Sequence, residues 1–270
     1  MAAGQFFSAC ALLLTLGWLC PGMALGGEAT ASSLIREELR LRINGVEETW
    51  RLTWREPPTP VCSPEEGFAE WGMCPCAGFE FGEAGELDLL RLVPGRAEEH
   101  LHLTPFFLET PAPGACLRRW PLHETDSDQA ERPGFARMVR QRPPVRIMVL
   151  GDYDHDGLAG EFVLQIGAGP CGHQQAVLVG LDPRTSRLRI QGTAEQPERA
   201  LILEHPRHWE ELRIANGEIE VRQWPCGDHG GEEEETLMLR ADQAGLHATR
   251  IRRACPDDGS PGQELSREIL

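Results

Sequence analysis

Three aspartates at alternating positions form the segment of this chain with the clearest capacity for chemistry. Asp152, Asp154 and Asp156 are followed at once by Gly157. Alternation can direct the three carboxylates toward one centre, and the glycine permits a sharp turn that lets a later backbone carbonyl join them. A cage of oxygens suits a hard cation such as Ca²⁺. The spacing therefore predicts a calcium site made of these three side chains, with the carbonyl of Leu158 as a further ligand.

The residues after the aspartates separate this loop from an EF-hand, which requires a glutamate at position 12, where this chain has Val163. The loop resembles those of FG-GAP, VCBS and related β-repeat proteins, in which D-x-D-x-D-G joins two strands and a ninth-position aspartate completes the site. Here the ninth position is Gly160, and Glu161 follows it. The resemblance implies four side chains as calcium ligands: Asp152, Asp154, Asp156 and Glu161.

The apolar run before the aspartates supports a second interpretation. Residues 146–157, which end in G-D-Y-D-H-D-G, also resemble the first motif of the DHH phosphoesterases, whose aspartates hold Mn²⁺ or Mg²⁺ for phosphodiester hydrolysis. The chain has no Asp-His-His triplet, and its nearest match is Gly227-Asp228-His229-Gly230. A metal-dependent extracellular hydrolase is therefore an alternative function. Because nucleophile motifs such as G-x-S-x-G are absent from the sequence, a role without catalysis is favoured.

Residues 1–26 have the composition of an export signal. The apolar run from Phe6 to Leu19 is short for a membrane span, Pro21-Gly22 interrupts it, and small residues follow. We expect cleavage of this segment and a mature chain that is secreted, periplasmic or extracellular, with no membrane segment of its own.

The charge of the chain restricts its partners and its chemistry. The net charge is −16, which argues against nucleic acid as a partner because phosphate binding requires clustered cations. All 26 basic residues are arginine. The absence of lysine excludes Schiff-base catalysis and a P-loop lysine. Partners and oligomeric state are not predicted.

The cysteines predict disulfide bonds. Nine are present, and two of them lie in the export signal. In an exported protein the other seven are expected to oxidise, and because seven is odd, one thiol is left over or joins another chain. The best single pairing is Cys226–Cys255, and strain within Cys74-Pro75-Cys76 predicts separate partners for its two cysteines. The remaining candidates are Cys62, Cys116 and Cys171.

The hydrophobic pattern predicts a mainly β protein with two packed, antiparallel, sandwich-like halves. Apolar residues alternate with arginines on both sides of Asn44-Gly45, which is a strong hairpin signal. A second Asn-Gly turn is expected at Asn216-Gly217, a strand at Val145–Leu150, and a solvated loop at Glu204–His208. Short strands at intervals of 8–12 residues support the β class.

The composition divides the chain into five expected parts. They are the signal (1–26), an N-terminal β-rich domain (34–110), a Pro-rich connection (111–144), a C-terminal β-rich domain with the Asp loop (145–256) and a disordered tail (257–270). The whole chain is similar to uncharacterised exported bacterial proteins that carry G-D-Y-D-H-D-G, Cys74-Pro75-Cys76-Ala77-Gly78-Phe79 and Pro170-Cys171-Gly172. This resemblance implies export and a shared fold but no activity, so a cell-surface interaction module is a third possible function.

Overall fold

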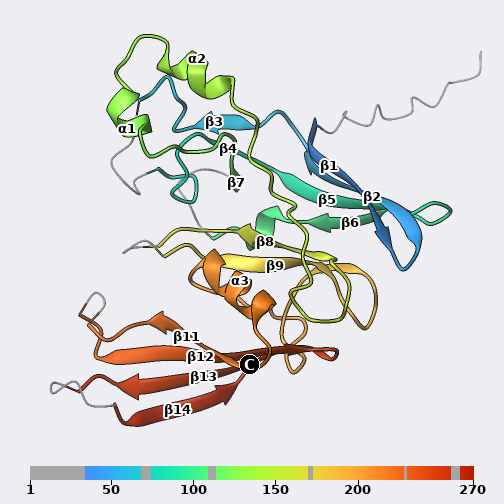
Figure 1. The fold of residues 1–270 in the computed structure, drawn as a ribbon, viewed down its shortest axis with the longest axis vertical. Coiled ribbons are helices and arrows are strands. Elements are labelled where there is room, and N and C mark those ends of the chain that lie inside the picture. The colour runs from blue at the N-terminus through green and yellow to red at the C-terminus, as the bar shows by residue number, and fades with distance from the viewer. Residues whose placement is uncertain (1–33, 68–73, 109–113, 170–172, 228–229, 257–261) are drawn as a thin grey trace, which may run out of the picture. The chain divides into compact units, whose positions relative to one another are not determined.

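The computed structural model describes residues 34–67, 74–108, 114–169, 173–227, 230–256 and 262–270. Their strands form four sheets, and every pairing within these sheets is antiparallel (Figure 1). The predicted mainly β, disulfide-bonded fold is therefore confirmed. The predicted signal, 1–26, lies outside the described residues.

The first sheet contains the predicted hairpin. Asn44 and Gly45 both have positive φ, 49° and 80°, as a two-residue turn between twisted strands requires. Trp50, Leu52 and Trp54 alternate along one face of the second strand and are almost completely buried. The strands, in spatial order, are β1 (Leu34–Ile43), β2 (Val46–Trp54), β5 (Leu87–Leu92) and β6 (Glu99–His102).

A second, smaller sheet extends into the segment predicted as a connection. Its strands are β3 (Thr59–Val61), β4 (Gly82–Gly85) and β7 (Ala115–Arg118), with β4 in the middle. The 3-10 helix η1 (Thr104–Phe106) precedes β7, and the short helices α1 (Asp126–Gln129) and α2 (Phe135–Arg140) follow it. The Pro-rich connection therefore contributes one strand to a sheet before it becomes helical.

The third sheet shares its core with the first. Its order is β10 (Leu188–Ile190), β9 (Ala176–Leu181) and β8 (Glu161–Gln165). All six residues of β9 are buried. One hydrophobic core contains Trp50 and Leu89 from the N-terminal half together with Phe162 and Val179 from the C-terminal half. The two halves therefore pack through common apolar side chains.

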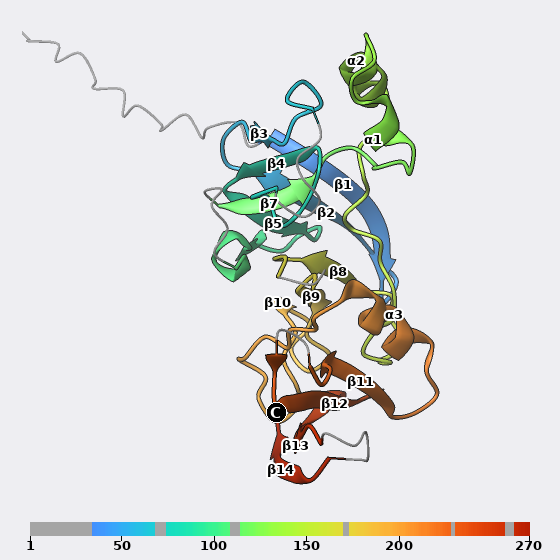
Figure 2. The same cartoon turned by 90° about the vertical axis from the view of Figure 1, so that its left-hand side faces the viewer.

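The fourth sheet and helix α3 (Pro206–Ile214) complete the C-terminal half (Figure 2). Trp209 of α3 is buried in a second core with Leu178 of β9 and Leu237 of β12. The sheet has the order β11 (Ile219–Trp224), β12 (Glu233–Asp242), β13 (Gly245–Ala254) and β14 (Glu264–Ile269).

Strand β14 corrects the prediction of a disordered tail over 257–270. Residues 264–269 form an edge strand paired with β13, while 257–261 lie outside the described residues. The N–H of Leu270 donates to the carbonyl of Ala248 at 2.9 Å, and the Leu270 side chain is only 6% exposed. An edge strand is held by backbone hydrogen bonds, so its exposed polar side chains gave no sign of it.

Three local predictions in the C-terminal half are also wrong. Residues 145–150 form no strand, because the carboxylate of Glu37 accepts the N–H groups of Ile147 and Met148 at 2.7 and 3.3 Å. The predicted loop at 204–208 runs into α3, with Pro206 in its first turn. Residues 216–217 consequently join a helix to a strand and not two strands.

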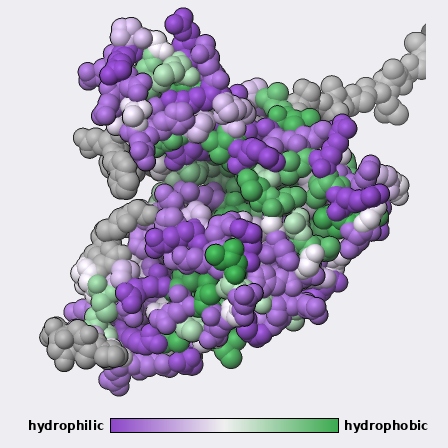
Figure 3. Space-filling view, in the orientation of Figure 1, coloured by the Kyte–Doolittle hydropathy of each residue, from purple (hydrophilic) through white to green (hydrophobic). Residues whose placement is uncertain are grey.

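None of the helices among the described residues combines the length and apolar character needed to cross a bilayer. The face shown in Figure 3 is mostly hydrophilic, and hydrophobic side chains gather on it around β2 and β5.

Candidate metal centre

The two ends of the Asp loop are joined by backbone hydrogen bonds. Gly151 and Glu161 form an isolated bridge, with N–O distances of 2.8 and 3.2 Å in its two hydrogen bonds. Between them the chain turns sharply, since His155 has φ 59° and Gly157 has φ +91°. The bridge places Glu161, the first residue of β8, directly opposite the start of the aspartate run.

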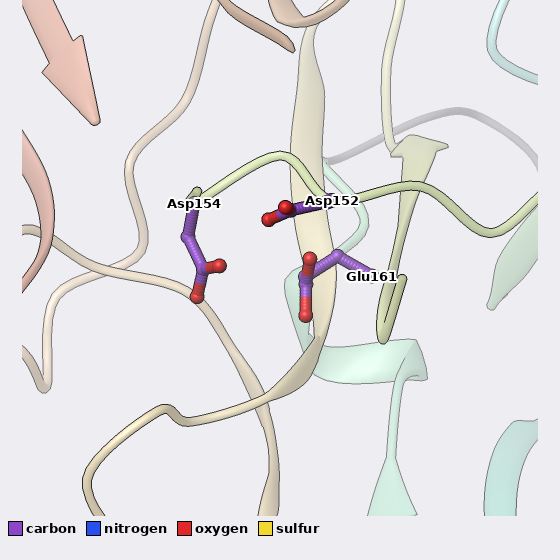
Figure 4. A group of neighbouring side chains, drawn as sticks. All are labelled: Asp152, Asp154 and Glu161. Carbon is purple, nitrogen blue, oxygen red and sulfur yellow. The ribbon is translucent and has the colours of Figure 1, made fainter. Parts of the chain in front are cut away.

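Three of the predicted ligands converge at this bridge. Figure 4 shows the carboxylates of Asp152, Asp154 and Glu161 directed toward a common region, and one oxygen from each lies within 4.8 Å of the others. Oxygens that share one calcium ion at about 2.3–2.6 Å are at most about 5 Å apart. The three oxygens therefore satisfy the geometric requirement for ligands of one cation.

In each of these carboxylates the two oxygens have different surroundings. One oxygen accepts a hydrogen bond of 3.2 Å from a backbone N–H of the loop: Gly157 to Asp152 Oδ2, Asp156 to Asp154 Oδ1, and Tyr153 to Glu161 Oε2. The other oxygen is buried and has no hydrogen-bond partner in the described part of the chain: Asp152 Oδ1, Asp154 Oδ2 and Glu161 Oε1. Buried polar atoms normally have partners, so these three oxygens can accept either protons or a cation.

Burial and mutual repulsion perturb these acids strongly. Asp154 and Glu161 are each 1% exposed. Burial, followed by the charge of Asp156, raises the pKa of Asp154 to about 7. Burial, followed by the charge of Asp154, raises the pKa of Glu161 to about 9. Without a cation the cluster therefore resists full ionisation at neutral pH.

The other two predicted ligands have different surroundings. Asp156 Oδ1 accepts the N–H of Leu158 at 2.7 Å, and this carboxylate is not among the three convergent groups. Burial raises its pKa as well. The side chain of Leu158 packs against the main core, and its carbonyl remains a predicted ligand.

Helix α3 supports the loop from one side. The hydroxyl of Tyr153 donates to Glu210, whose other oxygen accepts from Arg213 Nε at 2.8 Å. His155 Nε2 lies 3.1 Å from the Arg213 carbonyl. Burial, and then the bond to Glu210, raise the pKa of Tyr153, so the phenol stays protonated. Sequence reasoning missed this helix, although Pro206 three residues before Trp209 is a helix-start signal.

We expect Tyr153→Phe to lower the free energy of unfolding by about 1 kcal/mol, because it removes one hydrogen bond to a half-exposed carboxylate. Urea unfolding measures this loss, and a double-mutant cycle with Glu210→Ala isolates the pair. A coupling energy of zero between the two positions would contradict the assigned contact.

The described part of the chain contains two disulfide bonds. Cys226–Cys255 is the predicted pair, and Cys62–Cys74 joins two residues whose pairing the sequence left open. Cys74 and Cys76 therefore differ in their partners, as strain within the tripeptide predicts. Cys76 and Cys116 are buried thiols outside both bonds. Cys171 lies outside the described residues.

The histidines near α3 line a separate groove of about 950 Å³. Its walls include His173, His205 and His208 together with Glu204 and Arg222. His173 stacks on Trp224, with ring centroids 4.1 Å apart. Within the described ranges, the group at Asp152, Asp154 and Glu161 is the one set of three His, Cys, Asp or Glu side chains whose ligand atoms converge.

Comparisons of the chain with protein-family models, with curated proteins and with solved structures find no match.

Proposed function

We propose that this chain is a secreted calcium-binding protein in which one ion clamps the Asp loop onto the start of β8. The proposal rests on one observation, which is that the two carboxylate oxygens differ in their hydrogen bonding in each of Asp152, Asp154 and Glu161. Each carboxylate uses one oxygen to accept a hydrogen bond from the loop backbone, and its other oxygen is buried and without a hydrogen-bond partner among the described residues. One oxygen from each of the three lies within 4.8 Å of the others.

The donor set supports calcium over a softer metal. Three carboxylates supply only oxygen, whereas zinc sites are commonly built from Cys and His ligands. Calcium accepts six to eight oxygens in flexible geometry, so Asp156, the Leu158 carbonyl and water can complete the shell. Magnesium demands near-ideal octahedral geometry and gives up its waters reluctantly, which suits a buried site poorly. The two disulfide bonds support an oxidising compartment.

The burial of the cluster supports a structural ion over a catalytic one. A hydrolytic metal needs a bound water that a substrate can reach. Here Asp154 and Glu161 are 1% exposed, and the void beside Asp154 measures about 10 Å³, enough for about one water molecule. His155, which could serve a catalytic water, is instead bonded to α3. The hydrolase and the surface interaction module remain predictions.

Calcium binding predicts a stabilisation that depends on this site. We expect Ca²⁺ at a hundredfold excess over its Kd to stabilise the wild type by about 2.7 kcal/mol, which raises Tm by several degrees. The shift should vanish in Asp154→Ala and persist in Asp128→Ala, an exposed aspartate of α1. Differential scanning fluorimetry after chelation and readdition of the ion measures both.

A wild-type Tm that ignores Ca²⁺ would contradict the proposal. Parallel titrations with Mg²⁺, Mn²⁺ and Zn²⁺ test the choice of ion, since a larger shift with Mn²⁺ would favour the hydrolase alternative. Native mass spectrometry before and after chelation reports the number of ions and should show one.

A further inference from the structure

Two buried thiols lie in contact beside the Cys62–Cys74 disulfide. Cys76 and Cys116 are each 0% exposed and belong to one small core with Cys74. A side-chain hydrogen bond joins the two thiols. They are 40 positions apart in sequence, so their contact is produced by the fold and not by the local chain.

The second sheet brings these thiols together. Cys116 on β7 is the register partner of Ala84 on β4. Glu83 precedes Ala84 on β4, and its carbonyl oxygen accepts a hydrogen bond from Cys76 Sγ at 3.7 Å. Gly82 makes room for it, because a Cβ at this position would lie 2.7 Å from Cys76 Sγ. The loop that carries Cys76 is thus seated on β4 directly beside Cys116.

We propose that Cys76 and Cys116 form a third disulfide bond in the mature protein. The neighbouring Cys62–Cys74 bond shows that the same loop is oxidised in the folded chain. Two thiols in hydrogen-bond contact need side-chain rotation to reach bonding distance, about 2.05 Å between the sulfurs. The bond fixes the loop to β7 and completes the separate pairing of the two cysteines in Cys74-Pro75-Cys76.

The oxidation uses an external disulfide, such as that of a disulfide oxidoreductase or of oxidised glutathione. One thiolate attacks the incoming disulfide and forms a mixed disulfide, and the second thiolate then displaces the carrier. One Sγ–Sγ bond forms, two S–H bonds are lost, and the carrier leaves as two thiols with both electrons and both protons. Burial in the folded state hinders attack, so the exchange occurs while the sheet assembles.

The sequence makes this bond unusually easy to map. Because the chain has no lysine, trypsin cleaves it only after arginine. Residues 56–91 then form one peptide that holds Cys62, Cys74 and Cys76, and residues 97–118 form another that holds Cys116. We expect a non-reducing digest of alkylated, denatured wild-type protein to contain these two peptides as one linked species. With the Cys62–Cys74 bond inside 56–91 also intact, its mass should be four hydrogen atoms below the sum of the two reduced peptides.

The Cys226–Cys255 bond supplies the internal control. Its linked peptides, 223–240 and 254–267, identify preparations that are oxidised, and the test is scored on such preparations. A link from 56–91 to 97–118 that fragmentation assigns to Cys76 supports the proposal. Alkylated Cys116, or a link through Cys62 or Cys74, overturns it.

Matched serine variants extend the test to stability. Cys76→Ser should expose Cys116 to alkylation and lower the folding equilibrium constant roughly hundredfold, because a loop of 40 residues is no longer closed. Cys171→Ser should keep the link and the stability. Should Cys76→Ser fail to fold, the wild-type peptide map alone decides.

Discussion

Glu161→Gln is expected to stabilise the chelated protein and to abolish its response to calcium. In the apo state the Glu161 carboxyl is buried against Asp154 and has an unpartnered oxygen. A glutamine is neutral and of nearly the same shape, and its amide can donate to the adjacent carboxylates. Relief of burial and repulsion should raise the free energy of unfolding by about 2 kcal/mol.

The same substitution removes an anionic ligand, so the calcium-dependent gain of about 2.7 kcal/mol should disappear. The substitution should therefore raise the free energy of unfolding of the apo protein and lower that of the calcium-loaded protein. A glutamate that does not bind the ion would not produce this combination. Urea unfolding in chelator and in excess Ca²⁺ measures both changes, and Glu198→Gln, at an exposed position, serves as control. Destabilisation of the apo protein by Glu161→Gln would show that this carboxylate is already satisfied without an ion.

Arg91→Met is expected to destabilise the protein by about 3–5 kcal/mol at neutral pH, since it leaves a buried carboxylate without its partner. Arg91 binds both oxygens of Glu48, at 2.7 and 2.6 Å, and also the Ser186 carbonyl at 2.5 Å. The side chains of Arg91 and Glu48 are 5% and 3% exposed. The pair therefore ties the first sheet to the segment between β9 and β10 inside the protein.

The size of this effect should depend on pH. Burial alone would raise the pKa of Glu48, but hydrogen bonds from Arg91 and Trp50 and the Arg91 charge outweigh it and hold the pKa below its ordinary value of 4.5. A lowered folded-state pKa gives stability that is complete above the ordinary pKa and is lost as pH falls through the folded value. The difference between wild type and variant should therefore be largest near neutral pH and shrink as the pH falls, because protonation of Glu48 removes the charge that Arg91 neutralises.

Two further variants give the Arg91 experiment its controls. Arg40→Met changes an arginine whose side chain is 85% exposed and should cost almost nothing. The double variant Glu48→Met/Arg91→Met removes both charges and should regain most of the loss. If Arg91→Met costs as little as Arg40→Met, the buried pair does not stabilise the fold. Denaturant unfolding across the pH range supplies all of these values.

The strand predictions succeeded where side-chain alternation and turn chemistry coincide. The hairpin at Asn44-Gly45 shows both signals, and β1 and β2 lie where they place them. The strand predictions failed where a side chain distant in sequence accepts hydrogen bonds from the backbone. No pattern in residues 145–150 reveals that Glu37, more than a hundred positions earlier, accepts two of their N–H groups. Every residue of strand β14 is exposed, and the strand depends on a neighbour that sequence alone does not identify.

The candidate site shows the same division. The spacing grouped Asp152, Asp154 and Asp156, and the resemblance to FG-GAP loops added Glu161. The structure brings together Asp152, Asp154 and Glu161. Their burial was not predictable, because it comes from segments later in the chain. Gly180 of β9 faces Glu161, and Gln191 and Gly245 lie near Asp154. Nor does spacing distinguish Asp156, whose carboxylate lies outside the convergent group. Tertiary packing decides which of several evenly spaced aspartates places its carboxylate in the cluster.

The core shared by the two halves affects the order of folding during synthesis. The inner face of the first sheet, with Trp50 and Leu89, is covered in part by Phe162 and Val179. This face can therefore be fully buried only after the ribosome has translated β9. Until then the nascent N-terminal half exposes the apolar surface that the C-terminal half later covers. If the chain is exported, as we propose, delayed folding of this kind would keep it unfolded for passage through a translocation channel.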